Sequence, residues 1–135
     1  MKTILVATLG GSHKTVVNAV IQHNPDALWI VCTAQSENRI SEIETEFSKQ
    51  EKIMPPLNGK TLVLHDNLSD IYQKIMLLLS QLSSQYMVTF DLTGGTVPMS
   101  LGVWEASQSF PDMIITWLDN TEPPKTYVLN RPSRD

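Results

Sequence analysis

The chain has 135 residues, a length at which proteins usually form one hydrophobic core, so we expect a single domain over residues 1–135. Its net charge of −4 argues against binding of bulk DNA or RNA, which depends on many Lys and Arg side chains. A small anionic ligand is not excluded, because backbone N–H groups and one or two cations can hold it. No apolar run reaches the roughly 18 residues of a membrane span.

The single cysteine and the N-terminal residues indicate in which cellular compartment the protein is expected. Cys32 is the only cysteine, which excludes an internal disulfide and leaves a zinc site without its usual ligands. Residues 3–9 already form a strand-like apolar run, and no leader pattern precedes them. We therefore expect a cytoplasmic protein without membrane association, and we expect neither a metal site nor a cofactor.

The first half of the chain alternates between strand and helix patterns. Residues 3–9 are apolar on both faces, as in a central parallel strand. Residues 13–23 carry apolar side chains on one side and stop at an Asn-Pro pair, which predicts a helix. Residues 28–33 predict a second strand. Ser36 is expected to cap a second helix, on which the apolar residues fall at helical spacing: Ile40, Ile43 and Phe47.

The second half continues this alternation. Residues 49–59, with a Pro-Pro pair, predict a connecting loop before a short third strand at 61–64. Residues 68–82 form a third amphipathic helix pattern. A fourth strand at 87–91, a helix at 97–109, a fifth strand at 113–118 and a sixth, edge strand at 126–129 complete the series. We predict an α/β, Rossmann-like domain with a mainly parallel sheet in the order 3-2-1-4-5, flanked by helices.

Two glycine pairs follow predicted strands: Gly10-Gly11 after the first and Gly94-Gly95 after the fourth. In the predicted order these strands are neighbours at the point where the winding reverses, and ligands bind there, outside the carboxyl ends of the strands. Glycine permits positive φ and lets a ligand approach the backbone without meeting a Cβ. We therefore predict that the two loops face each other across one phosphate-binding, nucleotide-type crevice.

Polar residues beside the glycine pairs fit the same site. Ser12 and Thr96 stand near the predicted helix starts, beside unpaired N–H groups and the positive end of a helix dipole. Lys14, one turn into its helix, adds a positive charge near the opening. Each feature also has a purely structural interpretation: the glycine pairs as tight turns, the hydroxyls as helix caps, His13 as a solvated residue and Asp91 as a tie for its own loop.

The two loops together resemble a known family. The run Asp91-Leu92-Thr93-Gly94-Gly95-Thr96-Val97-Pro98-Met99, with Ala7-Thr8-Leu9-Gly10-Gly11-Ser12, resembles CARF domains, the CRISPR-associated Rossmann-fold sensors. The resemblance covers nearly the whole order of elements. It implies a homodimer that binds a ring of adenylates, with cyclic tetra-adenylate favoured, across its two-fold axis in type III CRISPR antiviral signalling. It also implies a fused or separate effector, which these residues do not contain.

Carried over by position, the resemblance implies ligand contacts from both glycine loops and from the loop after the second strand. The implied ligand-binding residues are Gly10, Gly11, Ser12, His13, Gln35, Thr93, Gly94, Gly95 and Thr96. Many members carry a lysine directly after Gly-Gly-Thr, where this chain has Val97. This departure bears on cleavage of the ring more than on its binding.

Some members of the family are ring nucleases. In them a ribose 2′-hydroxyl attacks the adjacent phosphate without a metal and leaves a 2′,3′-cyclic phosphate, which requires positioning and charge stabilisation. Here Ser12, Lys14 and the loop N–H groups are the candidates for stabilising that charge, and His13 is the candidate for moving a proton. The sequence leaves open whether this chain cleaves its ring.

Three functions stay open from the sequence. The first is a cyclic oligoadenylate-binding module, with or without ring cleavage. The second is another nucleotide-binding enzyme, although the first loop lacks the full Gly-x-Gly-x-x-Gly spacing and the chain has no P-loop motif. The third is a structural or regulatory domain in which both glycine pairs are turns.

Overall fold

A six-stranded sheet runs through the middle of the molecule in this computed structural model, which describes residues 1–121 and 123–130. Its order is β3-β2-β1-β4-β5-β6. The strands are β1 Thr3–Thr8, β2 Ala27–Cys32, β3 Leu57–Leu62, β4 Met87–Asp91, β5 Ile114–Asp119 and β6 Lys125–Val128. Strands β1 to β5 are parallel, and β6 is antiparallel to β5. The predicted Rossmann-like α/β domain is therefore confirmed, with β6 as its edge strand; residues 131–135 lie outside the described part.

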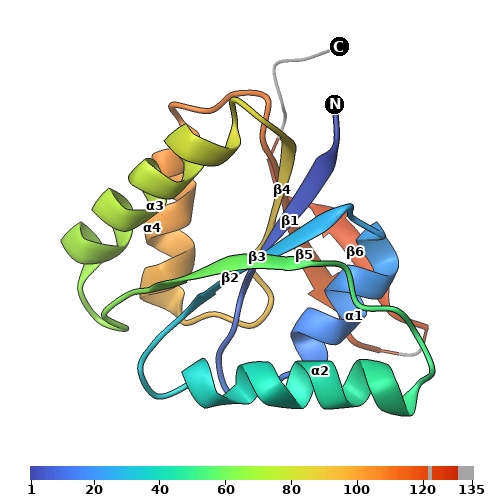
Figure 1. Cartoon of the computed structure of the whole chain (residues 1–135). Helices are drawn as coiled ribbons and strands as arrows, with labels where there is room; N and C mark the ends of the chain where they lie inside the picture. Colours follow the sequence, from blue (N-terminus) through green and yellow to red (C-terminus); the bar gives the residue numbers. More distant parts are fainter. Residues whose placement is uncertain (122, 131–135) are drawn as a thin grey trace.

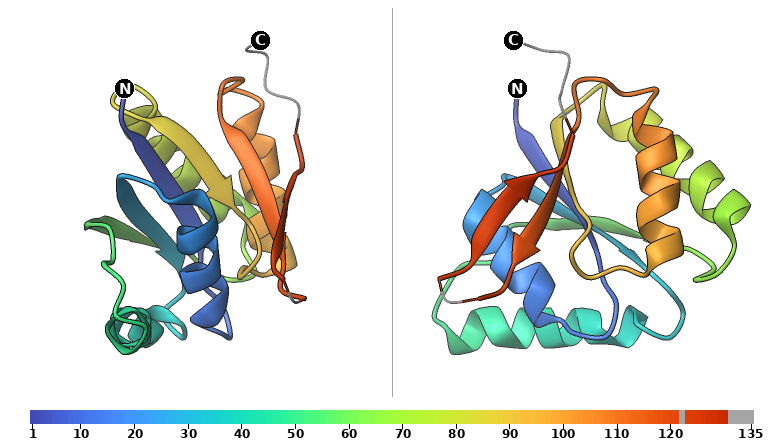
Figure 2. Two further views of the ribbon diagram at one scale, coloured as in Figure 1. Left: turned by 90° about the vertical axis from the view of Figure 1, so that its right-hand side faces the viewer. Right: turned by 180° about the vertical axis from the view of Figure 1, so that it is seen from behind.

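Helices cover both faces of this sheet (Figure 1 and Figure 2). Those of the described residues are α1 Lys14–His23, α2 Ile40–Lys49, α3 Leu68–Leu82 and α4 Val97–Ser107, with a short 3-10 turn, η1 Glu37–Arg39, directly before α2. Helices α1 and α2 pack on one face and α3 and α4 on the other. None of these helices is long and apolar enough to cross a membrane.

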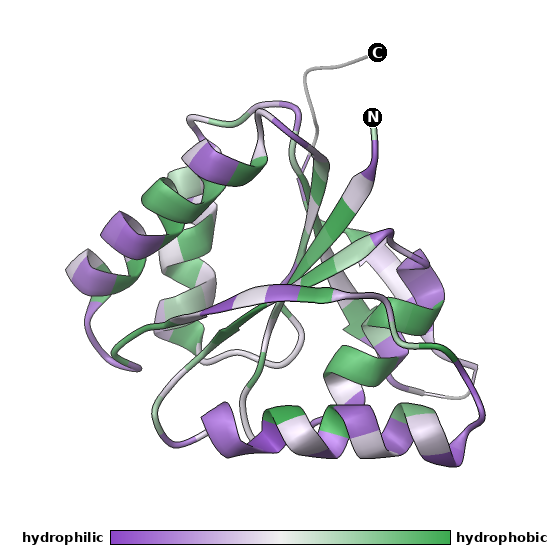
Figure 3. Ribbon diagram, in the orientation of Figure 1, coloured by the Kyte–Doolittle hydropathy of each residue, from purple (hydrophilic) through white to green (hydrophobic). Residues whose placement is uncertain are grey.

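The core is split into two apolar layers because the central strands are buried on both faces. Successive residues of a strand point to opposite faces, so Leu5 contacts the layer under α1 and α2, whereas Val6 contacts the layer under α3 and α4. Both side chains are fully buried. The apolar sides of α1, α2 and α3 face the sheet and their outer sides are mainly polar (Figure 3), whereas α4 also carries exposed apolar side chains. The two-layered core thus follows from the alternation of strand and helix patterns along the sequence.

Strand β3 begins earlier than predicted. It starts at Leu57, so the predicted loop over residues 49–59 is too long and the predicted strand over 61–64 starts too late. The edge position of β3 is the reason, because an edge strand has one neighbour and its residues alternate between half-buried and exposed. The Trp29 ring of the neighbouring strand packs directly on Gly59, where a side chain would not fit. A Cβ on Gly59 would lie 2.4 Å from the ring atom Cη2.

Ser36 does not cap helix α2, contrary to prediction. Helix α2 continues directly from η1, and the Ser36 side chain makes no capping bond. Its hydroxyl is buried and donates to the carbonyl oxygen of Leu9 at 2.8 Å, while it accepts from the Thr33 N–H at 3.0 Å. The residue therefore ties the loop after β2 to the end of β1.

A buried polar cluster secures the end of β4. The Asp91 carboxylate accepts from the Thr93 N–H and from the Thr116 hydroxyl, both at 3.0 Å, so Asp91 holds its own loop. His23 Nε2 lies 3.2 Å from the Thr116 hydroxyl oxygen. Burial lowers the pKa of His23 below its ordinary value, and the opposing attraction of Asp91 is the smaller effect.

The lowered pKa of His23 predicts a loss of stability in mild acid. Below its ordinary pKa of about 6.5, the unfolded chain binds a proton at His23 that the folded chain resists, so the folded state is destabilised as the pH falls. We expect His23→Gln to reduce the difference in free energy of unfolding between pH 7.5 and pH 5.5, measured by urea denaturation. An unchanged difference in the variant would contradict this role for His23.

Candidate functional site

The loops after β1 and β4 pack directly against each other. A Cβ on Gly10 would lie 2.0 Å from the carbonyl oxygen of Gly94, and one on Gly95 would lie 2.8 Å from Thr8 Cβ. No glycine of the described residues has a positive φ. These glycines are therefore required by the close approach of the two loops and not by a special backbone conformation. The loops meet as predicted, but their contact leaves no crevice where Gly10 and Gly94 touch.

A hollow of about 360 Å³ opens beside this contact, which we call the glycine hollow. It is lined by Leu9, Gly10, Gly11, Thr33, Gln35, Ser36, Arg39, His65, Thr96 and Met99. These residues come from the segments that follow β1, β2, β3 and β4. They lie at the carboxyl ends of the parallel strands, where open α/β sheets bind their ligands. The hollow therefore extends from the glycine contact toward β2 and β3.

Two hydroxyl groups fix the walls of the glycine hollow. Thr96 is the N-cap of α4, as predicted, because its hydroxyl oxygen accepts from the Met99 N–H at 3.3 Å. The same hydroxyl donates to the carbonyl oxygen of His65 at 3.3 Å, which holds the loop after β3 against the start of α4. The Ser36 hydroxyl secures the opposite side through Leu9. The walls are thus held by side chains that are already bonded to the protein.

The predicted ligand-binding residues divide between the glycine hollow and its surroundings. Those that line it are Gly10, Gly11, Gln35 and Thr96. Gly94 and Gly95 support it from behind, because they pack against Thr8. Thr93 is occupied elsewhere: its hydroxyl oxygen accepts from the Leu118 N–H of β5 at 2.8 Å.

The structure does not bring Ser12, His13 or Lys14 to the lining of the glycine hollow. Ser12 is exposed, and its hydroxyl oxygen accepts from the Lys14 N–H at 3.2 Å. The His13 ring lies between two carboxylates of α2, with Nδ1 3.2 Å from Glu42 and Nε2 3.7 Å from Glu46. Lys14 lines a separate hollow between α1 and α2, which Glu46 shares. The candidate catalytic residues Ser12 and Lys14 are therefore not among those that line the glycine hollow.

Sequence reasoning missed Arg39 and His65, which both line the glycine hollow. Arg39 follows Gln35 by four residues, and this spacing could have found it. His65 directly follows the predicted third strand, and this position at the carboxyl end of a parallel strand could have found it. Arg39 Nε is buried and has no hydrogen-bond partner within residues 1–121 and 123–130.

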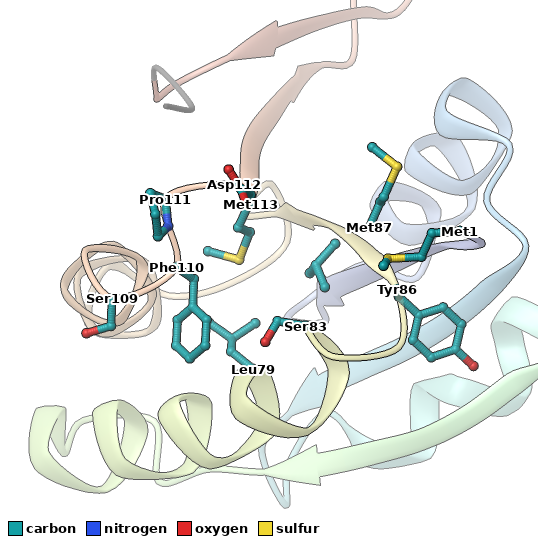
Figure 4. A pocket seen from close by; sticks show the side chains of 11 residues that line it. Met1, Leu79, Ser83, Tyr86, Met87, Ser109, Phe110, Pro111, Asp112 and Met113 are labelled. Atoms are coloured by element: carbon teal, nitrogen blue, oxygen red, sulfur yellow. The ribbon is translucent and has the colours of Figure 1, made fainter. Parts of the chain in front are cut away.

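A second hollow lies at the other end of the strands. It has a volume of about 460 Å³ and lies where β4 begins, beside the segment that joins α4 to β5 (Figure 4). Apolar side chains, including Tyr86, Met87, Phe110 and Met113, account for most of its lining. None of the predicted site residues lines it.

The packing of the glycines predicts different effects of the same substitution at two positions. Gly95→Val drives a branched side chain into Thr8 and should lower the free energy of unfolding by about 1–3 kcal/mol. Gly11→Val is the matched control, because a Cβ on Gly11 meets no atom within 4 Å, and it should change stability by no more than about 0.5 kcal/mol. Urea denaturation measures both. Equal losses at the two positions would show that the loops do not pack as described.

Comparison with known proteins identifies the fold. No protein-family model and no curated protein matches the chain. Among solved structures, Can2 from Sulfobacillus thermosulfidooxidans in complex with cyclic tetra-adenylate matches 96% of the chain with a TM-score of 0.75 and 16% identity. A type III CRISPR defence DNA nuclease activated by cyclic oligoadenylate matches 88%, with a TM-score of 0.67 and 18% identity. Protein VC1899 from Vibrio cholerae matches 98%, with a TM-score of 0.75 and 14% identity.

These similarities concern one part of larger proteins. The chain spans 38%, 19% and 34% of the length of the three solved structures, in the order given. At these identities the likeness establishes the fold alone. The chain therefore has the Rossmann-like fold of Can2 and of the type III CRISPR nuclease.

Proposed function

We propose that this chain is a cytoplasmic CARF-type domain that binds a cyclic oligoadenylate, with cyclic tetra-adenylate favoured, in type III CRISPR antiviral signalling. The observation that carries the proposal is the chemistry of the glycine hollow. Among the described residues its lining includes a guanidinium group, Arg39, and no carboxylate, which suits an anionic ligand. Two solved structures with this fold are described with cyclic tetra-adenylate bound or as activated by cyclic oligoadenylate.

The glycine hollow also offers groups for the other parts of a nucleotide. Gly11 is exposed and has open space where a side chain would be, so a phosphate or ribose can approach its backbone. Gln35 is exposed at the rim, and its amide carries both a donor and an acceptor, the pair that matches an adenine edge. These groups support an adenylate as the repeating unit of the ligand.

We propose binding without cleavage as the activity of this chain. In-line attack of a ribose hydroxyl needs charge stabilisation at the reacting phosphate, and the side chains expected to supply it for cleavage are Ser12, Lys14 and a lysine at position 97. Ser12 and Lys14 lie outside the lining of the glycine hollow, and Val97, at the position of the usual lysine, is exposed on α4. The cyclic ligand should therefore dissociate from the protein uncleaved.

The proposal includes a homodimer. One glycine hollow is at the lower end of the range of about 300–1,000 Å³ for small-ligand pockets, so a ring of several adenylates suits two hollows better than one. Helix α4 exposes an apolar stripe of Val97, Leu101 and Trp104, whose spacing of four and three residues places them on one side of the helix. Such a stripe suits a self-complementary two-fold interface between two copies of the chain. Through this dimer, binding of the ring would be signalled to a fused or separate effector.

A ligand panel tests the proposed function. We expect calorimetry with cyclic tetra-adenylate, cyclic hexa-adenylate, ATP and NAD to give binding of a cyclic ring and much weaker binding of ATP and NAD. Chromatography after overnight incubation with excess protein should recover the ring intact. Tight binding of NAD or ATP in place of both rings would favour another nucleotide-binding function, and linear products would overturn binding without cleavage.

A change on α4 tests the dimer. Leu101→Glu places a charge in the middle of the exposed stripe and should convert the wild-type dimer to a monomer, because an unpaired charge is costly to bury in an interface. Sedimentation equilibrium measures the mass, with and without cyclic tetra-adenylate. Glu105→Gln, an exposed position on the same helix, is the control and should stay dimeric. A wild-type monomer under both conditions would contradict the proposal.

A further inference from the structure

The glycine hollow has one permanently charged group among the described residues that line it. That group is Arg39, and none of the lining residues is acidic. His65 also lines it, but its imidazole is more than half exposed and lies 3.8 Å from the Asp66 carboxylate. Any fixed positive charge that the lining offers to a ligand therefore comes from Arg39.

The hydrogen-bonding capacity of Arg39 is not used by the described part of the protein. Its Nε is buried without a partner, and its guanidinium forms no salt bridge with the described residues. Other cations nearby are paired: Lys60 with Glu37 and Lys74 with Asp70. An arginine does not lose its proton in proteins, and a buried donor without a partner is costly. The guanidinium therefore has a donor, Nε–H, for which the described residues supply no acceptor.

Lys14, the cation expected from the sequence, has different surroundings. It shares its hollow with the Glu46 carboxylate, and the neighbouring His13 ring lies between Glu42 and Glu46. An anion placed beside Lys14 would be repelled by these carboxylates. In the part of the chain that the structure describes, no carboxylate lines the hollow beside Arg39. Local charge thus favours Arg39 over Lys14 as the residue that receives an anionic ligand.

We propose that Arg39 binds a phosphodiester group of the ligand in the glycine hollow, an assignment that rests on the proposed function. The planar guanidinium presents parallel N–H donors that match two phosphate oxygens, which a lysine ammonium does not do. Gln35, one turn earlier at the rim of the same hollow, is in position for the adenine. The segment after β2 therefore supplies the charged contact, and the two glycine loops supply the surface against which the backbone of the ring lies.

Calorimetry on three variants tests this assignment, with cyclic tetra-adenylate and cyclic hexa-adenylate as probes. Arg39→Gln should weaken binding by about 10- to 100-fold, the loss expected for one charged hydrogen-bonded contact. Arg39→Lys keeps the positive charge but lacks the parallel N–H donors of the guanidinium, so this variant should bind the ring with an intermediate affinity. Lys49→Gln, at the other end of α2, removes the same charge from an exposed position and should bind as wild type does.

Two further measurements separate a contact with the ligand from a structural role. The affinity of the wild type should fall between 50 and 200 mM salt, and Arg39→Gln should show a smaller fall, because one ionic contact is missing. Thermal unfolding should give similar midpoints for Arg39→Gln and Lys49→Gln. A lowered midpoint with an unchanged salt dependence would overturn the assignment in favour of a structural role.

The remaining outcomes distinguish the assignment from the function on which it rests. If the wild type binds a ring and Arg39→Gln binds it equally well, the role of Arg39 is wrong and the proposed function stands. If the wild type binds neither ring, the proposed function is wrong and the assignment fails with it. A graded loss from wild type through Arg39→Lys to Arg39→Gln is the result that the structure predicts.

Discussion

The absence of side chains where two loops meet is the constraint on which the site depends. Gly10, Gly94 and Gly95 bring the ends of β1 and β4 so close that a Cβ at any of them would overlap the opposite loop or Thr8. The glycines act through this contact, since no described glycine has a positive φ. Because the contact fills the space between the two loops, the ligand-sized hollow opens to one side, above the ends of β2 and β3.

The walls of that hollow are held by polar groups that are satisfied within the protein. The Ser36 hydroxyl bonds to the end of β1, the Thr96 hydroxyl bonds to the loop after β3, and Asp91 anchors the loop after β4 from below. Such bonds fix a site before a ligand arrives, so less freedom is lost on binding. Arg39 differs from these groups because its Nε has no partner among the described residues. A preformed cavity with one unused cation is a suitable receptor for an anion.

The fold could be predicted from the sequence because apolar runs alternate with helical patterns, and the two glycine pairs marked the edge of the sheet at which the glycine hollow lies. The position of the hollow could not be predicted, because it depends on which side chains face each other across four loops. Lys14 and Arg39 are both basic residues near a helix start, but Arg39 lines the glycine hollow, whereas Lys14 lines a different hollow together with Glu46. Ser36 has the sequence features of a helix cap, yet its hydroxyl bonds to Leu9, which is 27 residues away in the chain.

Nuclear magnetic resonance of the labelled chain, titrated with cyclic tetra-adenylate, tests most directly whether the glycine hollow is the binding site. The largest shifts are expected at the backbone amides of Gly11, Gln35 and Thr96 and at the Nε–H of Arg39, which all line the hollow. The hollow shared by Lys14 and Glu46 should be little affected. Shifts that cluster around Lys14, or around Phe110 at the other end of the sheet, would contradict the site.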